Sequence, residues 1–498
     1  SLSYPESIAR SNVSLTDNST VEVRGNSGGL ININAKEFLL SEQSKIFAGI
    51  AEDQGSIDSP AGDITINATD SVKLIGLGPS SVGLGTEINN HVGTAPNRRE
   101  NLETPSNAVG DGGAIIINTS LLEISDQARI TANSYAQGNS GNLVLNTDNI
   151  IINGGAIAGL IFEGTGDAGN VTINNTDSII LNEGSNIQSQ VLKGGQGNVG
   201  DIKIDTKTLS INEKFSFILA DNASAGNAGN ITINATDAVL INGGGGENLG
   251  TTLSAILSQV QMDVVGDAGD ITIATPQLTL TNFGLISTNV RAGSVGNTGD
   301  VFLDVDTLTV DNGSVINALT ENDFDGGNIN INANTASLSN GGKIVVSGDA
   351  GGNGGSINLN VADTLNISSS NPPELVPFQE EILLNTASEA GLFSSTVAGT
   401  GDGGNIAIQA GSIELANNAS ILATTSTGTG GDVSLKVDKT VELQNNSLIS
   451  AEARGIGNGG NISIDSNFIV ASPEGNNNII ANASQGQGGN ITIDAESL

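Results

Sequence analysis

One short pattern returns along the whole chain: a glycine, a residue that is small or polar in every copy but the first, an aliphatic residue, any residue and a second aliphatic residue. It occurs fifteen times, and ten of the fourteen intervals between successive copies measure 27 to 31 residues. Self-similarity at such a period is the signature of repeat architectures, in which neighbouring units cover one another's apolar faces. The fifteen anchoring glycines are Gly29, Gly62, Gly113, Gly141, Gly169, Gly200, Gly229, Gly269, Gly299, Gly327, Gly355, Gly404, Gly431, Gly460 and Gly489.

The two aliphatic positions of each copy predict a β-strand. In the copy "GNITINATDAVLIN" (229–242), Ile231 and Ile233 are two residues apart and therefore lie on the same face of an extended chain. We expect Ile231 to point into the core. Each unit contains two more alternating runs, which here are "AVLIN" (238–242) and "TLSAILS" (252–258).

Three short strands per unit, with no helical pattern between them, predict that each unit forms one turn of a coil. Equivalent strands of successive coils then stack in parallel and share a core. We therefore expect an all-β fold, a right-handed parallel β-helix (β-solenoid) of about 15 coils of about 28 residues, with three strands per coil. We expect residues 1–498 to form a single continuous solenoid that is a fragment of a longer protein.

The Gly, Asn and Asp residues of the repeat are interpreted as structural. Corners between strands need residues with positive φ, which glycine adopts without steric cost. The residue after the anchoring glycine is Asn in seven copies and Asp in five. Identical amides that stack from coil to coil can form hydrogen-bonded ladders along the solenoid.

The charge balance excludes several classes of function. The net charge is −36, from 53 acidic and 17 basic residues, and this disfavours nucleic acid and anionic membrane surfaces as partners. The chain has no cysteine, which excludes disulfides and Cys-based zinc sites. Because no apolar run reaches the length of a membrane-spanning helix, we expect no membrane insertion.

The repeat is interrupted by insertions, which are the candidate sites of ligand contact because loops on solenoids are less constrained than the coil. The two largest are predicted as inserted loops at 76–110 and 368–391, and a smaller one is "GGGGENLG" (243–250). The first holds the single histidine of the chain and a basic pair, and the second holds an aromatic residue beside two acids. The candidate ligand-contact residues are His91, Arg98, Arg99, Phe378, Glu380 and Glu381.

Catalytic and cofactor motifs are not recognisable in the sequence. A glycosidase needs two carboxylates at a fixed separation, but with 53 acids such pairs carry no information. The string "NTD" (146–148) recurs at 175–177, and the similar "NATD" occurs at 67–70 and 234–237, so the string belongs to the repeat. "GDGGNI" (401–406) resembles part of a calcium-binding nonapeptide, but the period here is about 28 residues. We expect no catalytic residue and no cofactor, apart from loosely bound Ca²⁺ on acidic turns.

The repeats resemble those of filamentous-haemagglutinin-like exoproteins of two-partner secretion. The resemblance is carried by "GNITINATDAVLI", "GDAGNVTINNTDSIIL", "DNGSVINA" (311–318) and "NNASILATTSTGTGGDVSL" (417–435), and it covers nearly the whole chain. It implies export through an outer-membrane β-barrel transporter and a location at the outer cell surface or in the medium. It also implies adhesion to a host-cell, matrix or glycan surface. We expect the secretion domain of that family to lie outside this chain.

Together these observations predict a secreted, cell-surface structural and adhesive stalk without catalytic activity. Two alternatives stay open. One is a polysaccharide-active β-helix enzyme, either a lyase or a glycoside hydrolase, which a groove lined by aromatic and paired acidic residues would favour. The other is a calcium-dependent surface-layer or matrix component.

Overall fold

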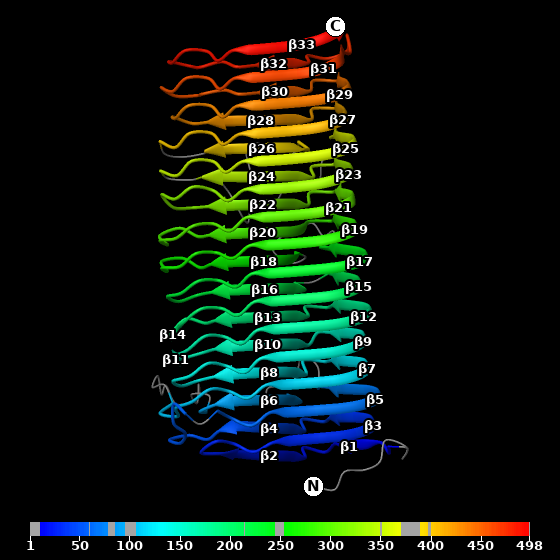
Figure 1. Cartoon of the computed structure of the whole chain (residues 1–498), viewed down its shortest axis with the longest axis vertical. Helices are drawn as coiled ribbons and strands as arrows, with labels where there is room; N and C mark the ends of the chain where they lie inside the picture. Colours follow the sequence, from blue (N-terminus) through cyan, green and yellow to red (C-terminus); the bar gives the residue numbers. More distant parts are fainter. Residues whose placement is uncertain are drawn as a thin grey trace. The chain divides into compact units, whose positions relative to one another are not determined.

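A computed structural model describes residues 10–58, 60–77, 85–94, 106–213, 215–244, 253–348, 351–369, 389–396 and 400–497. Within these ranges the chain is all-β, and no helix is present. Long and short strands alternate along the chain, and each strand pairs in parallel with the equivalent strand of the next coil (Figure 1). The predicted parallel β-solenoid is therefore confirmed, while its right-handed winding stays a prediction.

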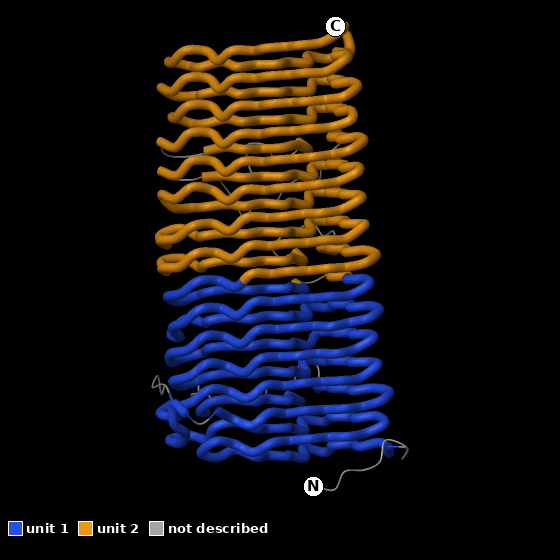
Figure 2. The backbone as a smooth tube through the Cα atoms, in the orientation of Figure 1, with its two compact units in different colours: residues 1–209, 216–229 blue, residues 210–215, 230–498 orange. Residues whose placement is uncertain are grey.

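The chain divides into two compact units (Figure 2). Unit 1 comprises residues 1–209 and 216–229, and unit 2 comprises residues 210–215 and 230–498. Each unit has one sheet of long strands and one sheet of short strands. The prediction of a single continuous solenoid over residues 1–498 stays a prediction.

In unit 1 the long-strand sheet has the order β1-β3-β5-β7-β9-β12-β15, and the short-strand sheet has the order β2-β4-β6-β8-β10-β13-β16. A further pair of two-residue strands, β11 and β14, adds a narrow third parallel contact. The long strands are β1 (Val13–Leu15), β3 (Ile31–Ser41), β5 (Ile64–Ile75), β7 (Ile115–Ser125), β9 (Leu143–Asn153), β12 (Val171–Asn182) and β15 (Ile202–Asn212). The short strands are β2 (Thr20–Gly25), β4 (Lys45–Ile50), β6 (Glu87–Val92), β8 (Arg129–Ser134), β10 (Ala156–Ile161), β11 (Gly164–Thr165), β13 (Asn186–Val191), β14 (Gly195–Gln196) and β16 (Phe217–Asn222).

Unit 2 repeats this arrangement, with β17 to β33 alternating between the two sheets. The long strands are β17 (Ile231–Asn242), β19 (Ile271–Thr281), β21 (Val301–Val310), β23 (Ile329–Ser339), β25 (Ile357–Ser368), β27 (Ile406–Ala416), β29 (Val433–Leu443), β31 (Ile462–Ala471) and β33 (Ile491–Ser497). The short strands are β18 (Ser254–Val260), β20 (Gly284–Val290), β22 (Val315–Thr320), β24 (Lys343–Gly348), β26 (Gly391–Thr396), β28 (Ser420–Thr425), β30 (Leu448–Ser450) and β32 (Asn478–Ile480).

The first aliphatic residue of all fifteen predicted copies is the first residue of a long strand, from Ile31 in β3 to Ile491 in β33. Ile231 and Ile233 are fully buried, as the alternation predicts. On the opposite wall of the core, most short strands contribute a buried aliphatic residue, such as Ile286 in β20. The core of each unit is thus made of aliphatic rows contributed by successive coils. The glycine pattern missed β1 and β2, which precede the first copy.

The prediction of three strands per coil is wrong in one respect, because the first two predicted runs form a single long strand. Residues 231–234 and 238–242 both belong to β17. The "NATD" segment between them stays extended and is absorbed as a β-bulge, where the register with β19 shifts between Asn234 and Ala238. A bulge inserts an extra residue into a strand without ending it, so the two runs are not separated by a corner.

Candidate functional site

The predicted inserted loop at 76–110 contains a strand of the coil. Residues 87–92 form β6, which pairs in register with β4 and β8. His91 therefore lies on a strand, where it pairs with Gly49 and Asn133. It is buried, with a relative exposure of 6%. Arg98, Arg99, Phe378, Glu380 and Glu381 lie outside the described residues, as do residues 78–84 and 95–105 of the first predicted loop and 370–388 of the second.

The His91 imidazole lies among rings and beside a guanidinium group. Arg24 Nη1 is 3.2 Å from His91 Nε2. The ring of Phe47 lies edge-on at 5.6 Å and that of Tyr135 at 6.4 Å, and Tyr135 in turn stacks on Phe162 at 4.7 Å. Burial, and then the positive charge of Arg24, lower the pKa of His91 to about 4. The imidazole is therefore neutral at physiological pH.

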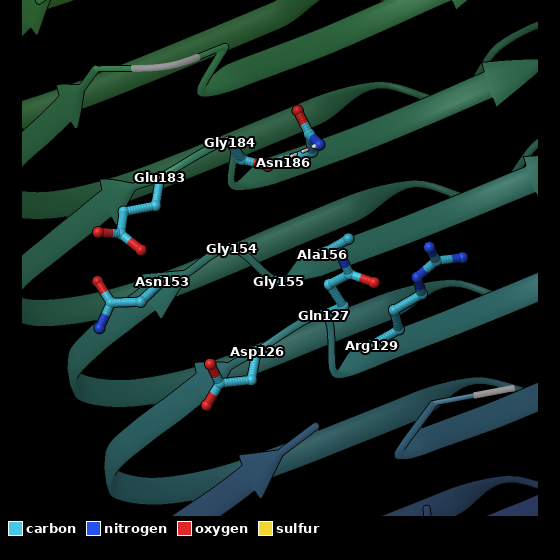
Figure 3. A pocket seen from close by; sticks show the side chains of 10 residues that line it. All are labelled: Asp126, Gln127, Arg129, Asn153, Gly154, Gly155, Ala156, Glu183, Gly184 and Asn186. Atoms are coloured by element: carbon cyan, nitrogen blue, oxygen red, sulfur yellow. Dashed lines mark hydrogen bonds between the residues drawn. The ribbon is translucent and has the colours of Figure 1, made fainter. Parts of the chain in front are cut away.

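A groove of about 360 Å³ lies at the corner between the long and short strands of unit 1 (Figure 3). Asp126, Asn153 and Glu183 come from this corner in three successive coils, and Arg129 extends from the start of β8. The backbone turns here through left-handed conformations, with φ of 56° at Asp126 and 57° at Glu183. The groove offers carboxylates and amides as hydrogen-bonding groups, together with one guanidinium.

The opposite corner of each coil, before the long strand, carries two ladders of Asn and Asp side chains. In one ladder, the backbone N–H of Asp167 donates to Asn139 Oδ1 at 2.7 Å, and that of Asn198 donates to Asp167 Oδ1 at 2.7 Å. In the other, the N–H of Asn170 donates to Asn142 Oδ1 at 2.9 Å. A shallow groove of about 420 Å³ runs between the two ladders. Unit 2 repeats both contacts, for example from Asn297 to Asp267 and from Asp300 to Asp270.

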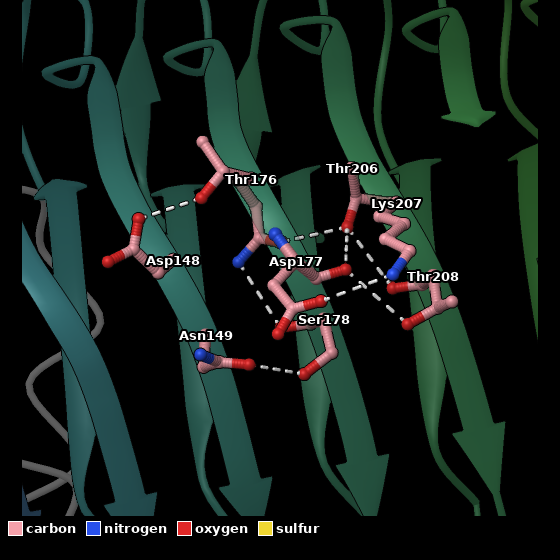
Figure 4. Close-up of polar contacts among 9 residues, drawn as sticks. Asp148, Asn149, Thr176, Asp177, Ser178, Thr206, Lys207 and Thr208 are labelled. Carbon is pink, nitrogen blue, oxygen red and sulfur yellow. Dashed lines mark hydrogen bonds and ion pairs between the residues drawn. The ribbon is translucent and has the colours of Figure 1, made fainter. Parts of the chain in front are cut away.

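A third row of polar contacts follows the bulges of the long-strand sheet (Figure 4). Thr176 Oγ1 donates to Asp148 Oδ1 at 2.7 Å, and Ser178 Oγ donates to Asn149 Oδ1 at 2.6 Å. Hydrogen bonds from Thr176 and Ser120 hold the pKa of Asp148 below its ordinary value.

In unit 2 the bulges line an open groove of about 680 Å³ that crosses five long strands. Amides and carboxylates such as Asn332 and Asp306 alternate in this groove with small residues such as Ala274. None of the described residues that line it is aromatic.

Beside these rows, Asn side chains form a ladder on the outer face of the long-strand sheet of unit 1. Asn67 donates to Asn34, and Asn118 donates to Asn67, at 3.1 Å and 2.7 Å. Asn146 and Asn174 extend the same ladder with bonds of 2.7 Å and 2.8 Å. This ladder confirms the predicted stacking of amides. No sequence motif points to the grooves, because they arise from the spacing between coils.

Within the described ranges, no group of three or more His, Cys, Asp or Glu side chains is arranged to hold a metal ion. This described part of the chain also contains no helix that is long and apolar enough to cross a membrane. The chain matches no protein-family profile, no curated protein and no solved structure.

Proposed function

We propose that this chain is the structural and adhesive stalk of a secreted cell-surface protein and that it does not act as an enzyme. The observation that carries the proposal is the repetition of side-chain ladders from coil to coil in both units. Many successive coils present amide or carboxylate groups in nearly the same positions, so a long partner could make many similar weak contacts. Such contacts gain strength from their number, since binding at one point raises the effective concentration at the next.

The resemblance of the repeats to filamentous-haemagglutinin-like exoproteins supports the same proposal. It extends the proposal to an outer-membrane β-barrel transporter as the export partner and to a host-cell, matrix or glycan surface as the adhesion partner. A mechanical role is supported by the way in which the coils pack. Each coil is stabilised by the coils next to it, so a stack of coils can form a stable stalk without large side chains.

Adhesion can be tested with microbeads that carry the purified chain. We expect these beads to attach to cultured cells or to extracellular matrix more often than beads coated with an inert protein of similar charge. We expect the same protein to release no reducing ends and no unsaturated uronate from a panel of polysaccharides. Turnover that a single carboxylate substitution abolishes would overturn the proposal in favour of the enzyme, and absence of attachment would remove its adhesive part.

A further inference from the structure

Rings and polar side chains gather on the outer face of three short strands in unit 1. Residues at alternating positions of β4, β6 and β8, such as Ile46, Ile88 and Ile130, point into the core. The residues between them point away from the core. We call this surface the His91 face, and it consists of Phe47, Asn89, His91, Thr131 and Asn133, with Tyr135 directly after β8.

Four polar side chains of the His91 face are deeply buried and have a polar atom without a hydrogen-bond partner. Their relative exposures are 7% for Asn89, 6% for His91, 5% for Thr131 and 4% for Asn133. The unpartnered atoms are Asn89 Oδ1, His91 Nδ1, Thr131 Oγ1 and Asn133 Oδ1, and they belong to adjacent positions of two paired strands. Buried polar atoms are nearly always hydrogen-bonded, so four exceptions on one face need an explanation.

The neighbouring guanidinium group defines what His91 can offer to a ligand. A guanidinium has donors and no acceptor, so Arg24 must donate to His91 Nε2. In the neutral imidazole the proton then lies on Nδ1, which becomes a donor without a partner. The face therefore presents one N–H donor, two amide oxygens that accept, and a hydroxyl that can do either.

The same face is rich in rings, although the chain has only 11 Phe, 2 Tyr and no Trp. Phe47 and Tyr135 flank the imidazole on its two sides, and Phe162 stacks on Tyr135. Three basic side chains lie nearby in a chain of net charge −36: Arg24 on the neighbouring β2, Lys45 on β4 and Arg129 on β8. Arg24 is ion-paired with Glu22, and Glu87 lies in register between Lys45 and Arg129.

We propose that the His91 face binds a sugar residue of a polysaccharide. Hydroxyl groups of a sugar would donate to the amide oxygens of Asn89 and Asn133, and a ring or hydroxyl oxygen would accept from His91 Nδ1. The apolar face of the sugar would lie against Phe47 or Tyr135, in the way that aromatic rings present a flat apolar surface beside polar groups. This inference deepens the adhesive part of the proposed function, on which it rests.

A structural explanation of the same atoms predicts a different result from substitution. If Asn89 and Asn133 bind no ligand, replacing them by leucine removes buried unpartnered oxygens together with the hydrogen bond from Asn133 Nδ2 to Tyr135 Oη. The replacement should then leave binding unchanged and change the melting temperature little. If they bind a sugar, the same replacement should abolish binding while the fold persists. Asn317 in unit 2 is a matched control, because it is buried too and both of its side-chain polar atoms are unpartnered.

The experiment uses the full chain and an immobilised panel of neutral and uronate-containing oligosaccharides, followed by calorimetry with each oligosaccharide that binds. We expect the Asn89→Leu/Asn133→Leu variant and the His91→Phe variant to lose at least ten-fold in affinity. We expect Asn317→Leu to bind like the unmodified chain. Tighter binding of the uronate-containing oligosaccharides would assign a role to the three basic side chains. Equal binding of neutral and uronate-containing oligosaccharides would show that the protein recognises the sugar hydroxyl groups.

The inference is overturned if no oligosaccharide binds, or if both variants bind as the unmodified chain does. Should the double variant fail to fold by circular dichroism, His91→Phe, which keeps an aromatic ring at this position, carries the test. The bead assay separates this inference from the proposed function. Attachment that persists in variants without sugar binding would place adhesion elsewhere on the coils, whereas sugar binding without attachment would remove adhesion and keep the sugar site.

Discussion

The anchoring glycines are required by the close approach of successive coils and not by positive φ. A Cβ atom built on Gly169 would lie 2.0 Å from the carbonyl oxygen of Gly141, and one on Gly404 would lie 1.9 Å from that of Gly355. The left-handed conformations at the other corner are adopted instead by residues such as Asn312 (φ 50°). The prediction that glycine serves the corners through positive φ is therefore wrong for the anchors.

We predict that Gly169→Ala destabilises unit 1, because the added methyl group would force two coils apart. The cost should be at least about 1–3 kcal/mol, the usual range for overpacking a tight site. Hydrogen exchange of β9 and β12 should show faster opening in the variant. Gly25→Ala is the control, since a Cβ there meets no atom within 4 Å. Equal protection in the two variants would contradict the role assigned to Gly169.

The lowered pKa of His91 predicts a contribution to acid sensitivity. The folded pKa is about 4, below the ordinary value of 6.5, so between these values the unfolded chain binds a proton that the folded chain does not. Stability from this group is fully present above pH 6.5 and is lost as the pH falls toward 4, by about 3 kcal/mol in total. Urea unfolding of the full chain and of His91→Phe at several pH values measures the difference. Parallel pH curves for the two proteins would contradict the prediction.

At the level of the strand, the bulge reconciles long strands of unequal length. β9 has 11 residues and β12 has 12, and their register shifts between Asn175 and Ser178. Val171 and Ile173 before the bulge and Ile179 and Leu181 after it are all buried. The extra residue at the centre therefore leaves both halves of the strand facing the core.

We predict that deleting Asp177 leaves the coil folded, because β12 then has the length of β9 and its halves keep their inward residues. Deleting Thr172 instead would place Val171 and Ile173 next to each other and turn one of them outward, since a one-residue slip reverses the faces of a strand. Circular dichroism and thermal unfolding should show near-unchanged behaviour for the first deletion and a large loss of stability for the second. Similar losses in both would show that the bulge is not a tolerant position.

At the scale of the whole molecule, the strong negative charge opposes compactness. The chain carries a net charge of −36, and the bulge rows and both corner grooves contain carboxylates. Self-repulsion of this kind is reduced by dissolved salt, which screens surface charges over about 10 Å at 0.1 M.

We predict that raising NaCl from low to physiological concentration increases the melting temperature of the full chain. CaCl₂ at the same ionic strength should give a similar increase if Ca²⁺ binds only loosely, and removal of Ca²⁺ with a chelator should then have little effect. Differential scanning calorimetry in the two salts makes the comparison. A saturable rise with Ca²⁺ at constant ionic strength would instead favour the calcium-dependent surface component.

The sequence by itself determined the fold class and the start of every long strand in the fifteen copies, because alternating aliphatic residues at a fixed period allow one set of faces to be buried. Tertiary structure decided the rest. The extended chain through "NATD", the crowding at Gly169 and the burial of His91 each depend on backbone or side chains from neighbouring coils. Those neighbours lie one repeat or more away in the sequence. A local sequence pattern does not encode how closely two coils approach each other in space.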